Sequence, residues 1–355
     1  MIVIADDITG AAEIAGIAFE HGQRVRLTCG SPEDCANYAS SETIVIATDT
    51  RSMTTEAARE ETLQIASAII HHPTVIFKKT DSALRGHVVA ELRALMQACG
   101  YQRAVYLPAN PSKGRIIHNG IYYIHDKPIA ETAFSYDPEF PAKTSVLKEC
   151  FPDAEDNHII MPDATDIEDI RQAIAQYNDG QTLFAGAADL FTEFLQTTGN
   201  TETTIDTKAP EKQAFNTLIL CGSTQSRPLD LEIPIAPMPI ALYDGDNDIS
   251  LWNTDSYING KGLILTIPHR HRTGKATAIH LRTIMAQKAK ALVAIHRPDH
   301  IIIEGGATAW AVLQALGWTQ FEILRQISAG VVSMRADCGT LVTLKPGSYP
   351  WGNIF

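Results

Sequence analysis

Residues 2–12 read Ile-Val-Ile-Ala-Asp-Asp-Ile-Thr-Gly-Ala-Ala, and the helical pattern that begins there continues to His21. The apolar run Ile2–Ala5 is short and rich in β-branched residues, which predicts a buried strand. A strand that leads at once into a helix is typical of an α/β fold. Asp6 and Asp7 are therefore expected at the carboxyl end of a strand, where open α/β sheets bind ligands.

The alternation of short apolar runs and longer helical patterns continues along the chain. The expected strands of the first half are Ile2–Ala5, Val25–Thr28, Ile44–Ala47, Val75–Lys78 and Ala104–Leu107, with helices at Gly10–His21, Thr55–Ile70 and Val88–Cys99. A second series has expected strands at Ile159–Met161, Leu218–Cys221, Gly262–Ile267 and Ile301–Glu304, with helices at Ala276–Ala294 and Thr308–Leu316. This order predicts mainly parallel sheets with helices on both faces. Between them, residues 115–140 are turn-rich, with turns expected at Asn119-Gly120 and His125-Asp126.

The chain has 355 residues, more than the roughly 250 to 300 at which single cores stop growing. The composition predicts a linker at Thr197–Lys212, which is polar, Thr-rich and poor in apolar residues. We therefore expect two α/β domains, residues 1–208 and 209–355, each a mainly parallel sheet flanked by helices. The active site is expected in the cleft between them.

Charge and composition restrict the class of partner. The net charge of −12 disfavours nucleic acid, because phosphate backbones bind dense Lys/Arg surfaces. An anionic small-molecule substrate must then be held by local cations. No apolar run approaches a membrane span and the N-terminus lacks a signal-peptide pattern, so we expect a cytoplasmic protein without a membrane partner. Whether it forms a homo-oligomer is left open.

Polar residues follow three of the expected strands. The first cluster is Asp6-Asp7, where one aspartate could cap the following helix but a second is unexplained by capping. Thr9 and Gly10 are expected to leave backbone amides free for an anion. The other two clusters are Thr48-Asp49-Thr50-Arg51-Ser52 and Lys78-Lys79-Thr80-Asp81-Ser82-Ala83-Leu84-Arg85-Gly86. Three such loops at equivalent strand ends are expected to converge on one place.

Arg51 and Arg85 can each bind a carboxylate through two parallel hydrogen bonds, which lysine cannot do. Their ordinary alternative is a surface ion pair. Within a converging set we favour ligand binding.

The second half offers glycine-rich turns that suit phosphate. They are Cys221-Gly222-Ser223, Glu304-Gly305-Gly306-Ala307-Thr308 and Lys345-Pro346-Gly347. Glycine turns that run from a strand into a helix expose amides to phosphate, although tight turns also need glycine for steric reasons. The chain has neither a GxxxxGK[ST] loop nor a GxGxxG turn in its first βαβ unit.

These ordered motifs resemble the four-carbon acid sugar kinases, which act on threonate, erythronate and oxo-tetronate type acids. The family signature Ala-Asp-Asp-Leu-Thr-Gly-Ala is similar to residues 5–11, Ala-Asp-Asp-Ile-Thr-Gly-Ala. Further agreement lies at Asp49-Thr50-Arg51, Lys78–Ser82, Leu84-Arg85-Gly86, Pro108–Pro111 through Gly114-Arg115, Pro128–Thr132 and Asp137-Pro138.

In the second half the resemblance is looser. The family has a Gly-Ser loop, a Gly-Gly-Asp/Glu-Thr loop and a Lys-x-Gly-x-Phe-Gly ending, which look like Gly222-Ser223, Gly305–Thr308 and Lys345–Tyr349. This chain has Ala307 where the family usually has an acid, and Glu304 is the candidate to compensate. Its ending, Tyr349-Pro350-Trp351-Gly352, also departs from the family pattern.

The resemblance implies transfer of the γ-phosphoryl group of ATP, with Mg²⁺, to a terminal hydroxyl of a sugar acid. It implies that Arg51 and Lys79 neutralise the carboxylate, that Asp81 and Ser82 bind hydroxyls, with Thr80 and Arg85 also in the substrate site, and that Asp7 accepts the proton. Asp6 is the alternative proton acceptor, or else a ligand of Mg²⁺. Gly222, Ser223, Gly305, Gly306, Ala307, Thr308 and Gly347 would hold the nucleotide. The alternative is a non-catalytic sugar-acid sensor or pseudokinase with a degraded nucleotide site. An aldolase or dehydratase that acts on sugar acids without ATP is less favoured, because neither a Schiff-base lysine nor metal-ligand spacing stands out in this sequence.

Overall fold

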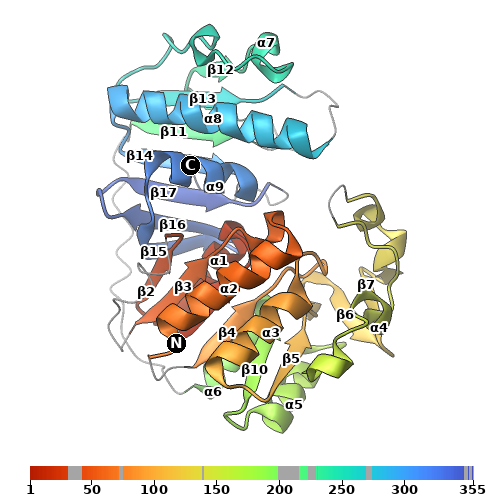
Figure 1. Cartoon of the computed structure of the whole chain (residues 1–355). Helices are drawn as coiled ribbons and strands as arrows, with labels where there is room; N and C mark the ends of the chain where they lie inside the picture. The colour runs from red at the N-terminus through yellow and green to blue at the C-terminus, as the bar shows by residue number, and fades with distance from the viewer. Residues whose placement is uncertain are drawn as a thin grey trace. The chain divides into compact units, whose positions relative to one another are not determined.

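The computed structural model of the chain describes residues 1–30, 42–71, 75–137, 140–198, 216–222, 229, 231–268, 274–347, 351 and 354. The chain divides into two compact units, Met1–Thr203 and Thr204–Phe355 (Figure 1). The boundary expected between residues 208 and 209, and most of the expected linker, lie outside the described residues. No helix in the described ranges is long and apolar enough to cross a membrane.

Unit 1 is built on a parallel sheet with strand order β2-β3-β1-β4-β10-β5-β9. Its strands are β1 Ile2–Ala5, β2 Val25–Thr28, β3 Thr43–Ala47, β4 Ile76–Lys79, β5 Arg103–Leu107, β9 Ile159–Ile160 and β10 Thr182–Gly186. The central strands are buried along their whole length, as expected for a parallel sheet covered on both faces. All five strands predicted in the first half are present, within one residue at each end.

Helices cover this sheet in two groups. They are α1 Ile8–Glu20, α2 Thr55–Ile69, α3 Val88–Cys99, α5 Ile167–Tyr177 and α6 Ala188–Thr197. The short helix α4 Leu147–Cys150 lies instead beside the turn-rich excursion, where the amide of Leu147 donates to the carbonyl oxygen of Gly120 at 2.9 Å. Helix α2 packs against α3, in front of the sheet in Figure 1, and α6 packs against both α1 and α5. The amphipathic spacing of α2 explains its position, because Ala58, Ile65 and Ile69 are buried while most of its charged residues are exposed.

The turn-rich excursion forms a small antiparallel sheet of β6 Arg115–His118, β7 Ile121–Ile124 and β8 Lys127–Pro128. Both predicted turns are present. Asn119-Gly120 and His125-Asp126 all have positive φ, between 46° and 72°, which is what two-residue hairpin turns require.

Unit 2 has a mixed sheet with strand order β12-β13-β11-β14-β17-β16-β15. Its strands are β11 Thr217–Cys221, β12 Ile235–Pro237, β13 Gly262–Thr266, β14 His300–Glu304, β15 Gln320–Ser328, β16 Val331–Ala336 and β17 Leu341–Lys345, and its helices are α7 Ile240–Tyr243, α8 Lys275–His296 and α9 Gly306–Leu316. The first five strands of this order are parallel, whereas β15, β16 and β17 form an antiparallel meander. Each unit therefore has the predicted α/β architecture.

Candidate active site

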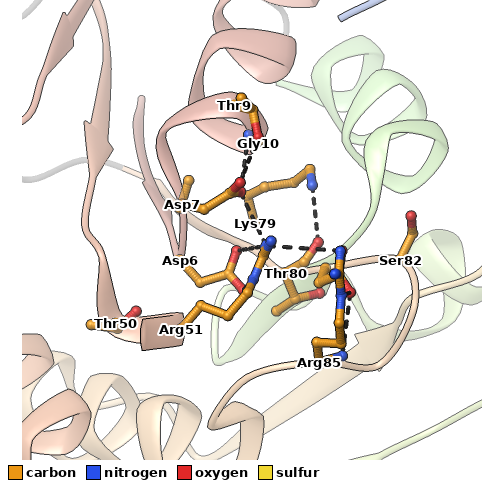
Figure 2. A network of polar contacts seen from close by, with 12 residues as sticks. Asp6, Asp7, Thr9, Gly10, Thr50, Arg51, Lys79, Thr80, Ser82 and Arg85 are labelled. Atoms are coloured by element: carbon orange, nitrogen blue, oxygen red, sulfur yellow. Dashed lines mark hydrogen bonds and ion pairs between the residues drawn. The ribbon is translucent and has the colours of Figure 1, made fainter. Parts of the chain in front are cut away.

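Three neighbouring strands of unit 1 bring the predicted polar clusters together. Strands β3, β1 and β4 lie side by side and run parallel, so their carboxyl ends share one edge of the sheet. Asp6 follows β1, Arg51 follows β3 in the short 3-10 helix η2 Thr50–Ser52, and Lys79 ends β4. Figure 2 shows these side chains pointing toward one another. The predicted convergence is confirmed.

Arg51 binds the two aspartates at the end of β1. Its Nε lies 3.0 Å from Asp6 Oδ2 and its Nη2 lies 2.8 Å from Asp6 Oδ1, a two-bond contact, and Nη2 also lies 3.0 Å from Asp7 Oδ1. Arg51 is 16% exposed, so it is not the surface ion pair of the ordinary alternative. Its guanidinium group is already paired, because the carboxylates that it binds are those of Asp6 and Asp7.

Asp7 caps the helix that starts the fold. Its Oδ1 accepts from the backbone amide of Gly10 at 3.0 Å and its Oδ2 from the hydroxyl of Thr9 at 2.5 Å. The expectation that the Gly10 amide is free for an anion is therefore wrong, because the cap uses it. A Cβ at Gly10 would lie 2.6 Å from Asp7 Oδ1, so a side chain there would displace the cap.

The two aspartates differ in ionisation. Burial raises the pKa of Asp6 despite the opposing charge of Arg51. Burial would also raise the pKa of Asp7, but Arg51 and Lys79 together lower it below its usual value. The side chain of Asp7 is 18% exposed and that of Asp6 only 3%. Asp7 is thus the more accessible carboxylate and the one held more firmly in its ionised form.

A second carboxylate–guanidinium pair lies after β4. Arg85 Nε is 2.7 Å from Asp81 Oδ2 and its Nη2 is 3.1 Å from Asp81 Oδ1, while Nη1 is 3.4 Å from Asp137 Oδ2. Arg51 Nη2 lies 3.9 Å from Asp81 Oδ1, which links this pair to the first. Like Arg51, Arg85 binds a carboxylate of its own chain. A ligand carboxylate would have to compete with this internal partner, which residue spacing alone does not reveal.

Lys79 belongs to a cluster that the sequence analysis missed. Its Nζ donates to the carbonyl oxygen of Thr80 at 2.9 Å and lies 3.6 Å from Glu13 Oε2. Lys113 Nζ lies 2.5 Å from Glu13 Oε1. Two lysines thus share one carboxylate, in the second turn of α1. The sequence feature that could have pointed to Glu13 is its position on α1, less than two helical turns after the N-cap residue Asp7.

The segment that carries Lys113 also carries Arg115, which donates to the hydroxyl of Ser82. Arg115 and Arg85 both lie 5.8 Å from the ring centre of Phe134. The motif Gly114-Arg115 is part of the family resemblance in the sequence, which predicts no role at the site for these two residues. Thr80 is 2% exposed, and its Oγ1 has no hydrogen-bond partner among the described residues. A buried hydroxyl in this state is available to a water molecule or a ligand hydroxyl.

In unit 2 the glycine-rich turns lie at the ends of neighbouring strands β11, β14 and β17. The amide of Gly222 donates to the carbonyl oxygen of Glu304 at 3.3 Å, and that of Gly305 to Lys345 at 2.9 Å. A Cβ at Gly222 would lie 2.1 Å from Thr308 Oγ1, so the strand end packs directly on the first turn of α9. Gly305 has φ of 97° and caps α9 without a side chain. Ser223 lies outside the described residues.

Glu304, the candidate to compensate for Ala307, is 1% exposed, and its Oε1 lies 2.6 Å from Lys345 Nζ in a buried ion pair. Its Oε2 has no hydrogen-bond partner among the described residues, so compensation by Glu304 stays a prediction. Ala307 is exposed and carries no ligand group. The described residues contain no group of three or more His, Cys, Asp or Glu that could hold a metal ion.

Two family models match the chain, one in each half. The sugar-binding N-terminal domain matches residues 1–193 and the nucleotide-binding C-terminal domain matches residues 258–349.

Curated relatives are named as sugar acid kinases. D-threonate kinase of Bordetella bronchiseptica is 33% identical over 151 residues, which are 40% of this chain and 36% of that protein. The chain thus spans about a third of that relative's length in the match. A 3-oxo-tetronate kinase of Haemophilus influenzae is 24% identical over 410 positions, covering 99% of this chain and 97% of the relative.

A crystal structure of a Haemophilus influenzae protein shares the fold. It has a TM-score of 0.70 and 21% identity, and the match covers 99% of this chain and 97% of that one. Because the sugar-binding model alone matches more than half of the residues and the nucleotide-binding model follows in order, this chain belongs to the four-carbon acid sugar kinase family.

Proposed function

We propose that the protein is a cytoplasmic ATP-dependent kinase that phosphorylates a terminal hydroxyl of a four-carbon sugar acid. The observation that carries the proposal is the Asp6–Asp7 pair, where one buried and one partly exposed carboxylate share Arg51 at the end of β1. The names of the curated relatives supply the substrate class.

Asp7 is the proposed acceptor of the proton from the attacking hydroxyl. Its lowered pKa makes it a weak base, yet the transition state of phosphoryl transfer is loose, so orienting the hydroxyl matters more than removing its proton early. Asp6 is the alternative base. It is less suited, because it is almost completely buried beneath Arg51.

The sugar acid is proposed to bind along the three strand ends of unit 1. Arg51 and Lys79 would neutralise its carboxylate, which must then share Arg51 with Asp6 and Asp7. The hydroxyls of Thr80 and Ser82, together with Asp81 and Arg85, would bind the hydroxyl groups of the acid. The unpartnered Thr80 Oγ1 supports this placement, because it leaves one buried hydrogen bond for a ligand to complete.

The nucleotide is proposed to bind at the glycine turns of unit 2. Helix α9 starts without a side-chain cap, which suits phosphate oxygens at its first turn. Gly222, Ser223, Gly305, Gly306, Ala307, Thr308 and Gly347 would surround the phosphates or the ribose. Mg²⁺ would neutralise phosphate charge and arrive with ATP, since such ions often keep waters and few protein ligands.

The rival is a sugar-acid sensor that has lost phosphoryl transfer. It draws support from Ala307, which leaves position 307 without a carboxylate, and from the buried ion pair that occupies Glu304 Oε1.

A coupled ADP-release assay decides between the two. Threonate, erythronate and their 2- and 3-oxo forms would be tested with ATP and Mg²⁺, with an ATP-only reaction as control. We expect turnover with at least one acid. An acid that raises the melting temperature but releases no ADP, together with no measurable ATP binding by calorimetry, would establish the sensor instead.

A further inference from the structure

A buried ion pair lies on the strand and helix next to the site, and the proposed reaction does not use it. Lys78 Nζ lies 2.5 Å from Glu91 Oε2, and both side chains are 1% exposed. Lys78 precedes Lys79 on β4, and Glu91 lies in the first turn of α3. Buried ion pairs add little net stability, because desolvation offsets their attraction. This pair is therefore a candidate for positioning the neighbouring residues of the site.

Two buried hydroxyls connect the pair to the backbone of the site. Thr50 Oγ1 donates to Glu91 Oε2 at 3.0 Å and lies 2.8 Å from Thr48 Oγ1, which is 2.9 Å from the carbonyl oxygen of Ala5. Thr50 is fully buried and Thr48 is 3% exposed. Ala5 and Thr50 are the residues directly before Asp6 and Arg51. The contacts thus run from α3 to the backbone on both sides of the Asp6–Arg51 pair.

Arg51 needs such support because its own segment is short. Helix η2 has three residues, and the amide of Arg51 makes only a long bond of 3.3 Å to the carbonyl oxygen of Asp6. A 3-10 turn has poor hydrogen-bond geometry and little stability alone. The hydroxyl of Thr50, one residue before Arg51, is a side-chain anchor of this turn to α3. A second anchor lies at the end of the turn, where Nε2 of His87, the N-cap residue of α3, is 2.8 Å from the carbonyl oxygen of Met53.

We infer that Thr50 and Glu91 are positioning residues for the proposed kinase, because their hydrogen bond holds Arg51 in the orientation in which it contacts Asp6 and Asp7. The kinetic part of this inference rests on the proposed function.

Two substitutions of Thr50 separate positioning from packing. Valine keeps the shape of threonine and removes the hydroxyl, whereas serine keeps the hydroxyl and leaves a methyl-sized cavity. If Thr50 only fills space, Thr50→Val is the milder change. If it positions Arg51, Thr50→Val should lower kcat by about 10- to 100-fold, and Thr50→Ser should retain several-fold more turnover despite a lower melting temperature.

Thr62 provides the matched control in the same unit. It is fully buried in α2, and its hydroxyl donates to the carbonyl oxygen of Ala58 at 2.7 Å. Thr62→Val should therefore leave kcat unchanged. An equal loss of kcat in Thr62→Val and Thr50→Val would overturn the inference, as would full activity in Thr50→Val.

A second measurement does not depend on turnover. Hydrogen exchange of the Arg51 Nε–H, assigned by its absence in Arg51→Lys, should be faster in Thr50→Val than in Thr50→Ser or the unmodified chain. Absence of turnover with every acid would reject the proposed function only. Equal exchange in the two Thr50 variants would then reject the positioning inference by itself.

Discussion

Asp7 combines a structural role with a proposed chemical one, and asparagine separates the two. Asparagine caps helices about as well as aspartate, so Asp7→Asn should still accept the amide of Gly10. We expect Asp7→Asn to keep the cap but to lose the attraction of Arg51 and Lys79, so that the melting temperature falls less than in Asp7→Ala, and to lower kcat by about 100-fold or more. Asp7→Ala is the control for the lost cap, at about 1 kcal/mol. Near-normal kcat in Asp7→Asn would reject the base role and direct attention to Asp6.

Asp81 should make stability depend on acidity. Burial alone would raise its pKa, but Arg51 and Arg85 lower the pKa well below its usual range. The unfolded chain therefore binds the proton more readily, so the stability that Asp81 confers is present above about pH 4 and lost as the pH falls. The difference in free energy of unfolding between the unmodified chain and Asp81→Asn should shrink from pH 7 to pH 3 in urea titrations. A constant difference would contradict the pairing.

At the scale of elements, α6 and the segment before β6 stabilise each other. Asp189, in the first turn of α6, accepts from the amide of Ser112 at 2.8 Å and from its hydroxyl at 2.7 Å. In return Asn110 Oδ1 accepts from the amide of Asp189, at a helix start whose own cap residue, Ala187, contributes no side-chain bond. The exchange fixes η3 Pro111–Lys113, the 3-10 helix that ends at Lys113.

Removing this exchange should weaken sugar-acid binding selectively. Asp189→Ala loosens the segment that carries Lys113 and Arg115, so the KM for the sugar acid should rise several-fold while the KM for ATP stays the same. Steady-state kinetics with each substrate varied in turn would measure both. A parallel rise in both KM values would instead indicate a general loss of structure.

In unit 2, a substitution of Gly222 tests the contact between the end of β11 and the first turn of α9. Because a Cβ there would lie 2.1 Å from Thr308 Oγ1, Gly222→Ala must push β11 away from the first turn of α9. We expect lower ATP affinity in calorimetry together with a lower melting temperature. Thr308→Ser, which keeps the hydroxyl, is the milder companion. Unchanged ATP affinity in Gly222→Ala would remove this contact from the proposed nucleotide site.

The sequence predicted the elements whose signal is local. Apolar β-branched runs located β1, β2 and β3, and parallel pairing then required their following loops to meet at one edge. It gave no strand at Thr182–Gly186, whose Ala and Gly have low β-propensity. The antiparallel β15–β16 pair also escaped prediction, although the two-residue connection between them permits only that direction.

The partners of the charged residues were the least predictable part of the site. The types and places of Arg51 and Arg85 follow from the sequence, but each binds a carboxylate of its own chain. Lys113 comes from a segment 100 residues away from Glu13. Contacts of that kind depend on how loops fold over a strand end, which no local pattern specifies.

At the scale of the whole molecule, the net charge of −12 opposes the approach of anionic substrates. Salt screens such repulsion beyond about 8 to 10 Å. The proposed recognition would therefore depend on short-range cations such as Lys79 in unit 1, and on backbone amides such as those at the start of α9 in unit 2. The two proposed ligands would thus be recognised by different chemistry in different units.

Hydrogen exchange measured on the full chain can test this division. ATP with Mg²⁺ should slow amide exchange at Gly222 and Gly305–Thr308, whereas the sugar acid alone should slow it at residues 49–52 and 79–85. The reason is that each ligand removes water from, and orders, only the loops that it contacts. ADP without the acid serves as the control for nucleotide binding. If ATP alone slowed exchange at residues 79–85 and left Gly305–Thr308 unchanged, the assignment of the nucleotide to the glycine turns of unit 2 would be wrong. The sugar-acid site at the end of β1 is tested separately, by the exchange measured with the acid alone.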